Sequence, residues 1–137
     1  MAVILKRSAT AFGGREGTIT TPEKTLELTM AKPKEMDGDG KGTNPEELFA
    51  AGYASCFASS IEFLLHKAKK SYEDIHVKAE AVLKTDGDAG FKFALEIEVQ
   101  IQGLDKDEQV RFTEQASQFC PFSKAVQGNV DIDINVL

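Results

Sequence analysis

The sequence of 137 residues contains no tryptophan, only two cysteines and only two histidines. Two cysteines are too few for the disulfide framework of a small secreted protein. Zinc needs three or four ligands, and His66 and His76 lack ligand spacing to Cys56 or Cys120, so we expect no metal site. A serine hydrolase is not indicated either, because no G-x-S-x-G motif occurs.

Positive charge is also scarce, with 16 Lys and Arg against 22 Asp and Glu and a formal net charge of −6. Binding to nucleic acid or to anionic membranes needs a cationic face, so we expect neither partner. The amino terminus, MAVILKRSAT, does not have the order or length of a secretory signal. The most apolar stretch, residues 48–65, contains Gly52, Glu62 and three serines, which favours a buried core helix over a membrane span. We therefore expect a cytoplasmic protein.

The composition is otherwise that of an ordinary globular domain, with 42% hydrophobic and 28% charged residues. A chain of this length buries about two-thirds of its unfolded surface, which is enough for a core without crosslinks. No internal repeat, low-complexity segment or linker interrupts it. We expect a single domain over residues 1–137.

One long helix is predicted by clear signals at its start. Asn44 is a favourable N-cap, Pro45 suits the first helical position, and Glu47 completes a capping box. We expect this helix to continue to about Lys70. Its middle is rich in small residues that allow another backbone to approach closely: Ala50, Ala51, Gly52, Ala54, Ser55 and Ala58.

A second helix is predicted from Asp105, where Glu108 again completes a capping box, to about Cys120, because Pro121 follows. A short helical turn is expected before Gly128. The order β-β-α-β-β-α-β, with antiparallel strands, indicates an α+β fold. The strands are predicted from alternating apolar and polar residues at 2–12, 25–30, 75–84, 91–101 and 130–136. We expect residues 18–21 to extend one of the first two strands. Residues 32–44 are predicted to form a polar loop.

The two cysteines are the first candidates for chemistry. Cys56 lies inside the first predicted helix and Cys120 at the end of the second. Their separation of 64 residues does not by itself predict contact. Both residues could be small buried hydrophobes, and the alternative is a pair of reactive thiols.

Arg15 and Glu46 are further candidates. Arg15 lies in the turn GGREG (13–17), whose glycines free the backbone to direct a guanidinium toward a carboxylate and a thiolate; a solvated turn residue is the alternative. Glu46 and Glu47 lie in the first turn of the long helix, where carboxylates stabilise the helix dipole. Aromatic residues flank both cysteines and suit either a core or an apolar pocket: Phe49, Tyr53, Phe57, Phe119 and Phe122.

Three segments together resemble the organic hydroperoxide resistance (Ohr) family, within the OsmC/Ohr superfamily of thiol peroxidases. They are GGREG (13–17), GTNPEELFAAGYASCF (42–57) and CPFSKAVQGNVDI (120–132), in the order and spacing of the family. FAAGYASCF is more similar to the Ohr branch than to the OsmC branch. The resemblance implies an OsmC/Ohr-like fold with a long central buried helix, in an intertwined homodimer.

The resemblance also implies roles. Cys56 matches the peroxidatic cysteine, Cys120 the resolving cysteine, Arg15 the active-site arginine, and Glu46 the glutamate that pairs with it. Departures from the family pattern, such as Phe122 for a common Tyr, spare these four positions. The implied activity is reduction of alkyl or fatty-acid hydroperoxides to alcohols. The implied reductant is an external dithiol, typically a protein-bound lipoyl group, with no bound cofactor.

The physical chemistry of thiols agrees with these roles. The thiolate is the nucleophile, and a free cysteine is only about 3% thiolate at pH 7, so a pKa of about 5–6 would raise the reactive fraction roughly thirtyfold. Arg15 beside Cys56 would supply this shift. Attack on ROOH would then give a Cys56 sulfenic acid that condenses with Cys120 to a disulfide, which a dithiol reopens.

Helix geometry predicts that the site is shared between two chains. Glu46 and Cys56 are ten residues apart, about 15 Å along a straight helix and roughly 80° around it. We therefore expect Arg15 and Glu46 of one subunit over Cys56 and Cys120 of the other. The alternatives are an OsmC-type peroxidase of broader specificity, a non-enzymatic redox sensor that uses the same cysteine, and a carrier of apolar ligands.

Overall fold

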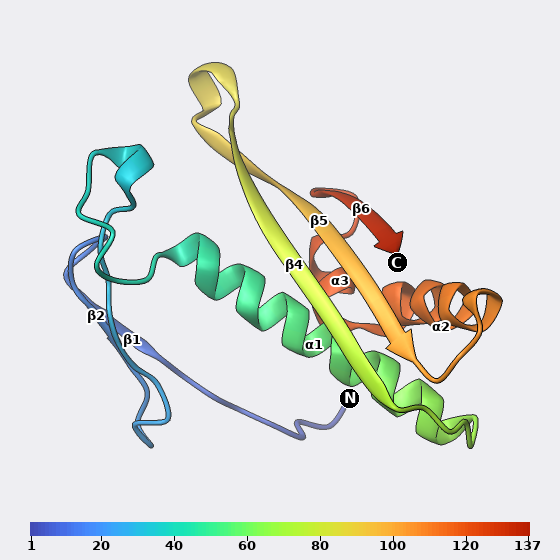
Figure 1. Cartoon of the computed structure of the whole chain (residues 1–137). Helices are drawn as coiled ribbons and strands as arrows, with labels where there is room; N and C mark the ends of the chain where they lie inside the picture. The colour runs from blue at the N-terminus through green and yellow to red at the C-terminus, as the bar shows by residue number, and fades with distance from the viewer. The chain divides into compact units, whose positions relative to one another are not determined.

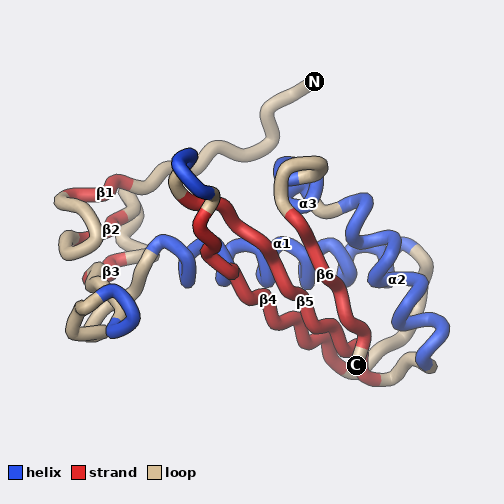
Figure 2. The backbone as a smooth tube through the Cα atoms, turned by 90° about the horizontal axis from the view of Figure 1, so that it is seen from above, coloured by secondary structure: helices blue, strands red, loops and turns tan.

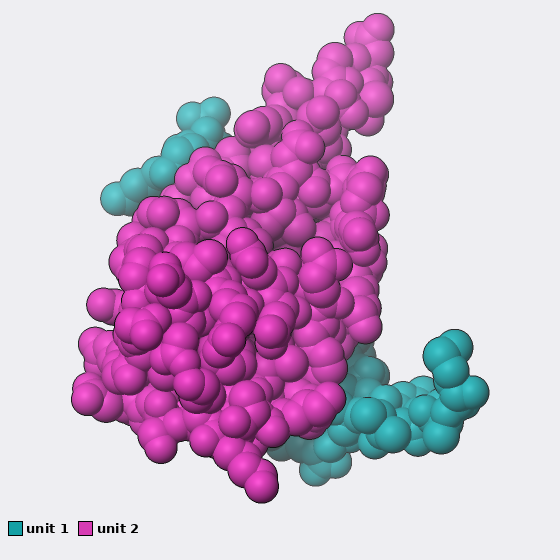
Figure 3. Space-filling view, turned by 90° about the vertical axis from the view of Figure 1, so that its right-hand side faces the viewer, with its two compact units in different colours: residues 1–48 teal, residues 49–137 magenta.

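The computed structural model describes all 137 residues, which form two compact units, residues 1–48 and 49–137, coloured separately in Figure 3. The first unit contains three short strands that form an antiparallel sheet in chain order. These are β1 (Thr10–Phe12), β2 (Thr18–Thr20) and β3 (Glu27–Thr29). A 3-10 helix, η1 (Lys34–Met36), lies within the predicted loop 32–44.

The long helix α1 (Pro45–Lys67) begins in the first unit and continues into the second. The predicted N-cap is confirmed, because the Glu47 amide donates to Asn44 Oδ1 at 2.8 Å. The Glu47 carboxylate accepts from Thr43 Oγ1 at 2.8 Å instead of closing the box on the cap residue. By length and composition α1 could cross a membrane, but the core helix of a soluble protein passes the same test.

The second unit is built on a three-stranded sheet (Figure 1). β4 (Asp74–Thr85) and β5 (Phe91–Gln102) form an antiparallel hairpin through η2 (Gly87–Ala89), and β6 (Asp131–Val136) adds to β5. Two helices connect β5 to β6: α2 (Lys106–Phe119) and α3 (Pro121–Val126). The Glu108 amide donates to Asp105 Oδ1 at 2.8 Å, which confirms the second predicted N-cap.

Three details of the predicted strands are wrong. Residues 18–20 form a separate strand, β2, and do not extend a neighbouring one. β6 pairs parallel to β5, not antiparallel, because α2 and α3 form a crossover that returns the chain to the starting end of the sheet. The strand predicted at 2–12 is limited to Thr10–Phe12, the only part that pairs with β2. The α+β architecture, with antiparallel hairpins and a long central helix, is otherwise as predicted.

The core lies in residues 49–137, where α1 extends along one face of the sheet (Figure 2). The positions of α1 that enter this core are spaced by four residues and so share one face of the helix. The fully buried side chains are Tyr53, Phe57, Ile61 and Leu65 of α1, and Leu95, Ile97, Val99 and Ile101 of β5, with Phe112 and Ala116 of α2 beside them. This core fixes the part of α1 that carries Cys56 against the segment that carries Cys120.

Candidate active site

The two cysteines are brought together by the fold. Both are free thiols, and their Sγ atoms lie 3.4 Å apart. Cys56 is in the middle of α1 and is partly exposed, whereas Cys120, between α2 and α3, is completely buried. The structure thus shows that the two sulfurs are in contact, which their separation of 64 residues in the sequence did not predict. Of the two sulfurs, only that of Cys56 is open to a molecule from solvent.

Local sequence explains why Cys120 reaches α1. Pro121 ends α2 and occupies the first turn of α3, so the chain bends at Cys120. Gly52, one turn before Cys56, allows α3 to approach, because a Cβ at this position would lie only 3.1 Å from the Phe122 ring. Gly52, one of the small residues of α1, therefore has a definite function at this contact.

The two thiols differ in acidity. Burial raises the pKa of the Cys56 thiol, and the neighbouring Cys120 adds to this, against a smaller opposite effect of the Phe122 amide. Burial also acts to raise the pKa of Cys120, but the Ser123 amide, the Cys56 thiol and the Ser123 hydroxyl together hold it below its usual value. None of these groups is a cation. Residues 49–137 therefore do not themselves provide the activation of Cys56 that we expected from Arg15.

Arg15 and Glu46 pair within residues 1–48. The guanidinium donates two parallel hydrogen bonds to the carboxylate, Nη1 to Oε2 at 3.0 Å and Nη2 to Oε1 at 2.7 Å. Hydrogen bonding to Arg15 lowers the pKa of Glu46 although burial opposes it, and the same pairing raises the pKa of Arg15. The bidentate geometry fixes the plane of the guanidinium, and the Arg15 side chain keeps 34% of its surface exposed.

Two glycines shape the turn that carries Arg15. Gly13 has a φ of +82°, in the region that favours glycine. A Cβ on Gly17 would lie 1.9 Å from the carbonyl oxygen of Phe12, so no other residue fits there without moving the backbone. The turn GGREG is thus specified by close backbone contacts, which hold Arg15 in place for Glu46.

Sequence reasoning missed a polar contact beside the thiols. Tyr53 Oη and Ser123 Oγ lie 2.6 Å apart, and both side chains are buried. By itself Tyr53 fits a core or pocket aromatic, and by itself Ser123 fits an ordinary helical serine. The available signal was a single hydroxyl on the apolar face formed with Phe49 and Phe57, together with a serine three residues after Cys120.

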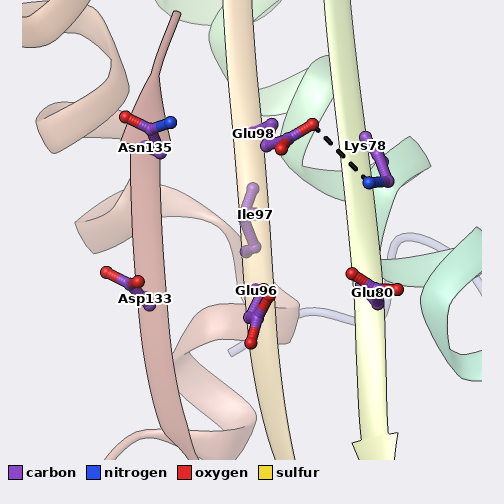
Figure 4. Close-up of a pocket in the computed structure, with 7 residues that line it drawn as sticks. All are labelled: Lys78, Glu80, Glu96, Ile97, Glu98, Asp133 and Asn135. Carbon is purple, nitrogen blue, oxygen red and sulfur yellow. Dashed lines mark ion pairs between the residues drawn. The ribbon is translucent and has the colours of Figure 1, made fainter.

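The outer face of the β4–β5–β6 sheet has a different character. A hollow of about 160 Å³ on this face has a lining that is almost entirely charged or polar, and Lys78 Nζ lies 3.7 Å from Glu98 Oε2. Figure 4 shows the residues that line it. Glu80, Glu96 and Asp133 are neighbours in strand register. The structure contains no group of three or more His, Cys, Asp or Glu residues that could hold a metal ion. This face fits a solvated surface, and the cysteine pair is the candidate active site.

Known proteins are similar to this chain in sequence and in fold. Residues 38–135 match the family of OsmC-like proteins. An organic hydroperoxide resistance protein-like 2 from Staphylococcus epidermidis is 42% identical over 127 residues, covering 90% of this chain and 89% of that protein.

Two crystal structures are similar over nearly their whole length. One is an organic hydroperoxide resistance protein from Legionella pneumophila, with a TM-score of 0.95, 38% identity and 98% of each chain covered. The other is the organic hydroperoxide resistance protein OhrB of Bacillus subtilis, with a TM-score of 0.90, 34% identity, and 98% of this chain and 100% of that chain covered. These similarities confirm the predicted α+β, OsmC/Ohr-like fold, and the chain belongs to the OsmC/Ohr family of organic hydroperoxide resistance proteins.

Proposed function

We propose that this protein is a cysteine-based peroxidase that reduces organic hydroperoxides to alcohols and thereby limits oxidative stress. The observation that carries the proposal is the 3.4 Å distance between the sulfurs of Cys56, which is partly exposed, and Cys120, which is buried. The names of the relatives from Staphylococcus epidermidis and Legionella pneumophila support the class of substrate.

The chemistry takes place in two steps on these sulfurs. The Cys56 thiolate attacks one peroxide oxygen, the O–O bond breaks, and the alcohol leaves with a proton while Cys56 becomes a sulfenic acid. Cys120 then attacks the Cys56 sulfur and displaces water. A disulfide has an S–S distance of about 2.05 Å, so the two sulfurs need only a small approach from 3.4 Å.

Arg15 is the proposed activator of Cys56. The surroundings of Cys56 in residues 49–137 raise its pKa, so a thiolate at neutral pH requires a nearby cation. Arg15, oriented by Glu46, is suited to this function and to holding the peroxide oxygens as charge develops.

We place the Arg15–Glu46 pair of one subunit over the cysteines of a second subunit in a homodimer. Glu46 and Cys56 both belong to the continuous helix α1, about 15 Å apart along an ideal helix. The exposed, small side chains of Ala51, Ser55 and Ser59 on α1 would allow a second copy to pack closely.

The substrates are alkyl or fatty-acid hydroperoxides. Phe63 and Phe119 stack with ring centroids 5.0 Å apart, and they and Phe122 are between 40% and 51% exposed. Phe119 and Phe122 flank Cys120 in sequence, and such exposed rings would favour an apolar substrate over hydrogen peroxide. The proposed reductant is a dithiol, in the cell a protein-bound lipoyl group, acting in the cytoplasm without a bound cofactor.

The test is consumption of cumene hydroperoxide with dihydrolipoamide by wild type, Cys56→Ser and Cys120→Ser. Wild type should turn over many equivalents, Cys56→Ser none, and Cys120→Ser about one before it stops, because its sulfenic acid has no internal partner. A wild-type protein that reacts once with every dithiol tried would indicate a redox sensor instead. Wild-type activity in Cys56→Ser would refute the mechanism.

A further inference from the structure

Aromatic rings lie on both sides of the thiol pair along α1. Cys56 and Phe63 are seven residues apart on this helix, which places them on the same side and about 10 Å apart along its axis. The Phe63 ring stacks on that of Phe119, with 5.0 Å between the centroids. In the other direction, one turn before Cys56, the Phe122 ring packs close to Gly52. The thiols are therefore bordered by apolar surface in both directions.

These rings remain open to solvent. Phe63 is 51% exposed, and Phe119 and Phe122 are each 40% exposed. Exposed apolar side chains that gather in one place mark a surface where an apolar molecule binds. A compact alkyl group on the peroxide would cover only the part beside Cys56. An acyl chain would cover the strip as far as the Phe63–Phe119 stack.

A cation borders this strip. Lys124 Nζ lies 5.9 Å from the centroid of the Phe119 ring, within the range of a cation–π contact. Lys124 follows Cys120 by one helical turn, and its amide donates to the Cys120 carbonyl at 3.0 Å. The ion pairs of the chain do not include Lys124, so no carboxylate of the same chain compensates its charge.

The chain as a whole would repel an anion, since its formal net charge is −6. Arg15, the other cation of the proposed site, is already held in a bidentate pair with Glu46. Lys124 therefore offers an uncompensated positive charge at the place where an acyl chain would lie. A molecule that matches both features has a carboxylate at one end of an apolar chain.

We propose that Lys124 is a specificity-determining residue, which binds the carboxylate of a fatty-acid hydroperoxide whose chain lies along Phe63 and Phe119 and whose peroxide group reaches Cys56. This inference rests on the proposed peroxidase function and narrows its substrates to hydroperoxides that carry a carboxylate. Lys124 takes no part in the reaction at sulfur, so its loss should change the choice between substrates. A neutral hydroperoxide should be used less well than an acid with the same chain.

The test compares one hydroperoxide in a charged and a neutral form. Consumption of linoleic acid hydroperoxide and of its methyl ester, both below the concentration at which micelles form, is measured with dihydrolipoamide. Wild type should have a kcat/KM about three- to tenfold higher for the acid than for the ester. Lys124→Gln should remove this preference by lowering the value for the acid, Lys124→Arg should keep it, and Lys124→Glu should reverse it.

Three comparisons separate the charge from the apolar contact. Lys84→Gln is the matched control, because it removes the same charge from an exposed position of β4, and it should keep the wild-type preference. Phe119→Leu should lower kcat/KM for acid and ester alike, since both have the same chain. Added salt should reduce the preference of wild type for the acid, because exposed ion pairs are screened; it should not reduce the acid rate of Lys124→Gln.

Binding can also be measured without turnover. In the Cys56→Ser background, calorimetric titration with the hydroxy acid formed from linoleic acid hydroperoxide should give a Kd about three- to tenfold lower than with its methyl ester. Lys124→Gln should remove this difference.

Equal kcat/KM for acid and ester in wild type, or a preference for the acid that survives Lys124→Gln, would overturn the inference. Failure of the proposed function would be recognised separately, because neither hydroperoxide would then be consumed. In that case the Kd values alone would decide, and equal values for the hydroxy acid and its ester would overturn the assignment of Lys124.

Discussion

Residues 49–137 contain both thiols and nearly all of the core, whereas residues 1–48 contain the ion pair and have only Met30 and Ala31 among the buried hydrophobic side chains. The sulfurs are positioned by the packing of α1 against the segment between α2 and α3, where Cys120 is buried. The guanidinium is positioned by two hydrogen bonds and by a glycine turn without a core beneath it. The two halves of the candidate site should therefore respond to different kinds of substitution.

The largest loss of stability is expected from the core of residues 49–137. Ile61→Ala removes a fully buried side chain and should lower the free energy of unfolding by about 2–5 kcal/mol, measured by urea denaturation. Leu26→Ala, at a position 43% exposed in residues 1–48, should cost less than about 1 kcal/mol. Equal losses of unfolding free energy in the two variants would contradict this difference between the two regions and show that another chain covers Leu26.

The glycine turn should control activity without separating the two thiols. Gly17→Ala forces the backbone away from Phe12 O and displaces Arg15, so hydroperoxide turnover should fall about 100-fold. Diamide should still form the Cys56–Cys120 disulfide, but more slowly than in wild type, because Cys56 loses the cation that stabilises its thiolate. Gly14→Ala is the matched control, because a Cβ there meets nothing within 4 Å; a loss of turnover in this variant equal to that in Gly17→Ala would refute the argument.

The two helix caps test whether both halves follow the same local rules. Asn44→Ala and Asp105→Ala each remove the oxygen that accepts an amide hydrogen at 2.8 Å. Each should lower the free energy of unfolding by about 1 kcal/mol. Only Asn44→Ala should also reduce turnover, since Glu46 follows that cap. Reduced turnover in Asp105→Ala instead would mean that the caps act through global stability.

The smallest effect is a pH dependence of the ion pair. Hydrogen bonds from Arg15 hold the pKa of Glu46 below its usual value although burial opposes them. A depressed carboxyl pKa contributes stability that is present above the unfolded pKa and is lost as pH falls through the folded pKa. Arg15→Gln should therefore flatten the fall in unfolding free energy below about pH 5. Arg7→Gln, which loses only a hydrogen bond to Lys6 O, should keep the wild-type slope.

Local features of the fold could be predicted from the sequence, whereas long-range features could not. The starts of α1 and α2 were predictable, because Asn44 and Asp105 act on amides three residues away. The β4–β5 hairpin was predictable from alternation. The parallel pairing of β6 was not, because it depends on how α2 and α3 cross the sheet and not on the residues of the strand.

The candidate site divides similarly. Arg15, Glu46, Cys56 and Cys120 were selected from motifs, but neither the ion pair across 31 residues nor the sulfur contact across 64 residues follows from spacing. The Tyr53–Ser123 pair was missed because each residue has an adequate local explanation by itself. A core tyrosine and a helical serine become a chemical feature only when α3 packs on α1.

The long separation between the two cysteines has a thermodynamic consequence. A bond between Cys56 and Cys120 would close a loop of 64 residues and restrict the unfolded chain by roughly 4 kcal/mol in the chain-entropy description of crosslinks. The oxidised protein would then resist heat and denaturant more strongly than the reduced protein. Oxidation by a hydroperoxide would therefore raise the free energy of unfolding for as long as the disulfide lasts. Reduction by a dithiol would lower it again.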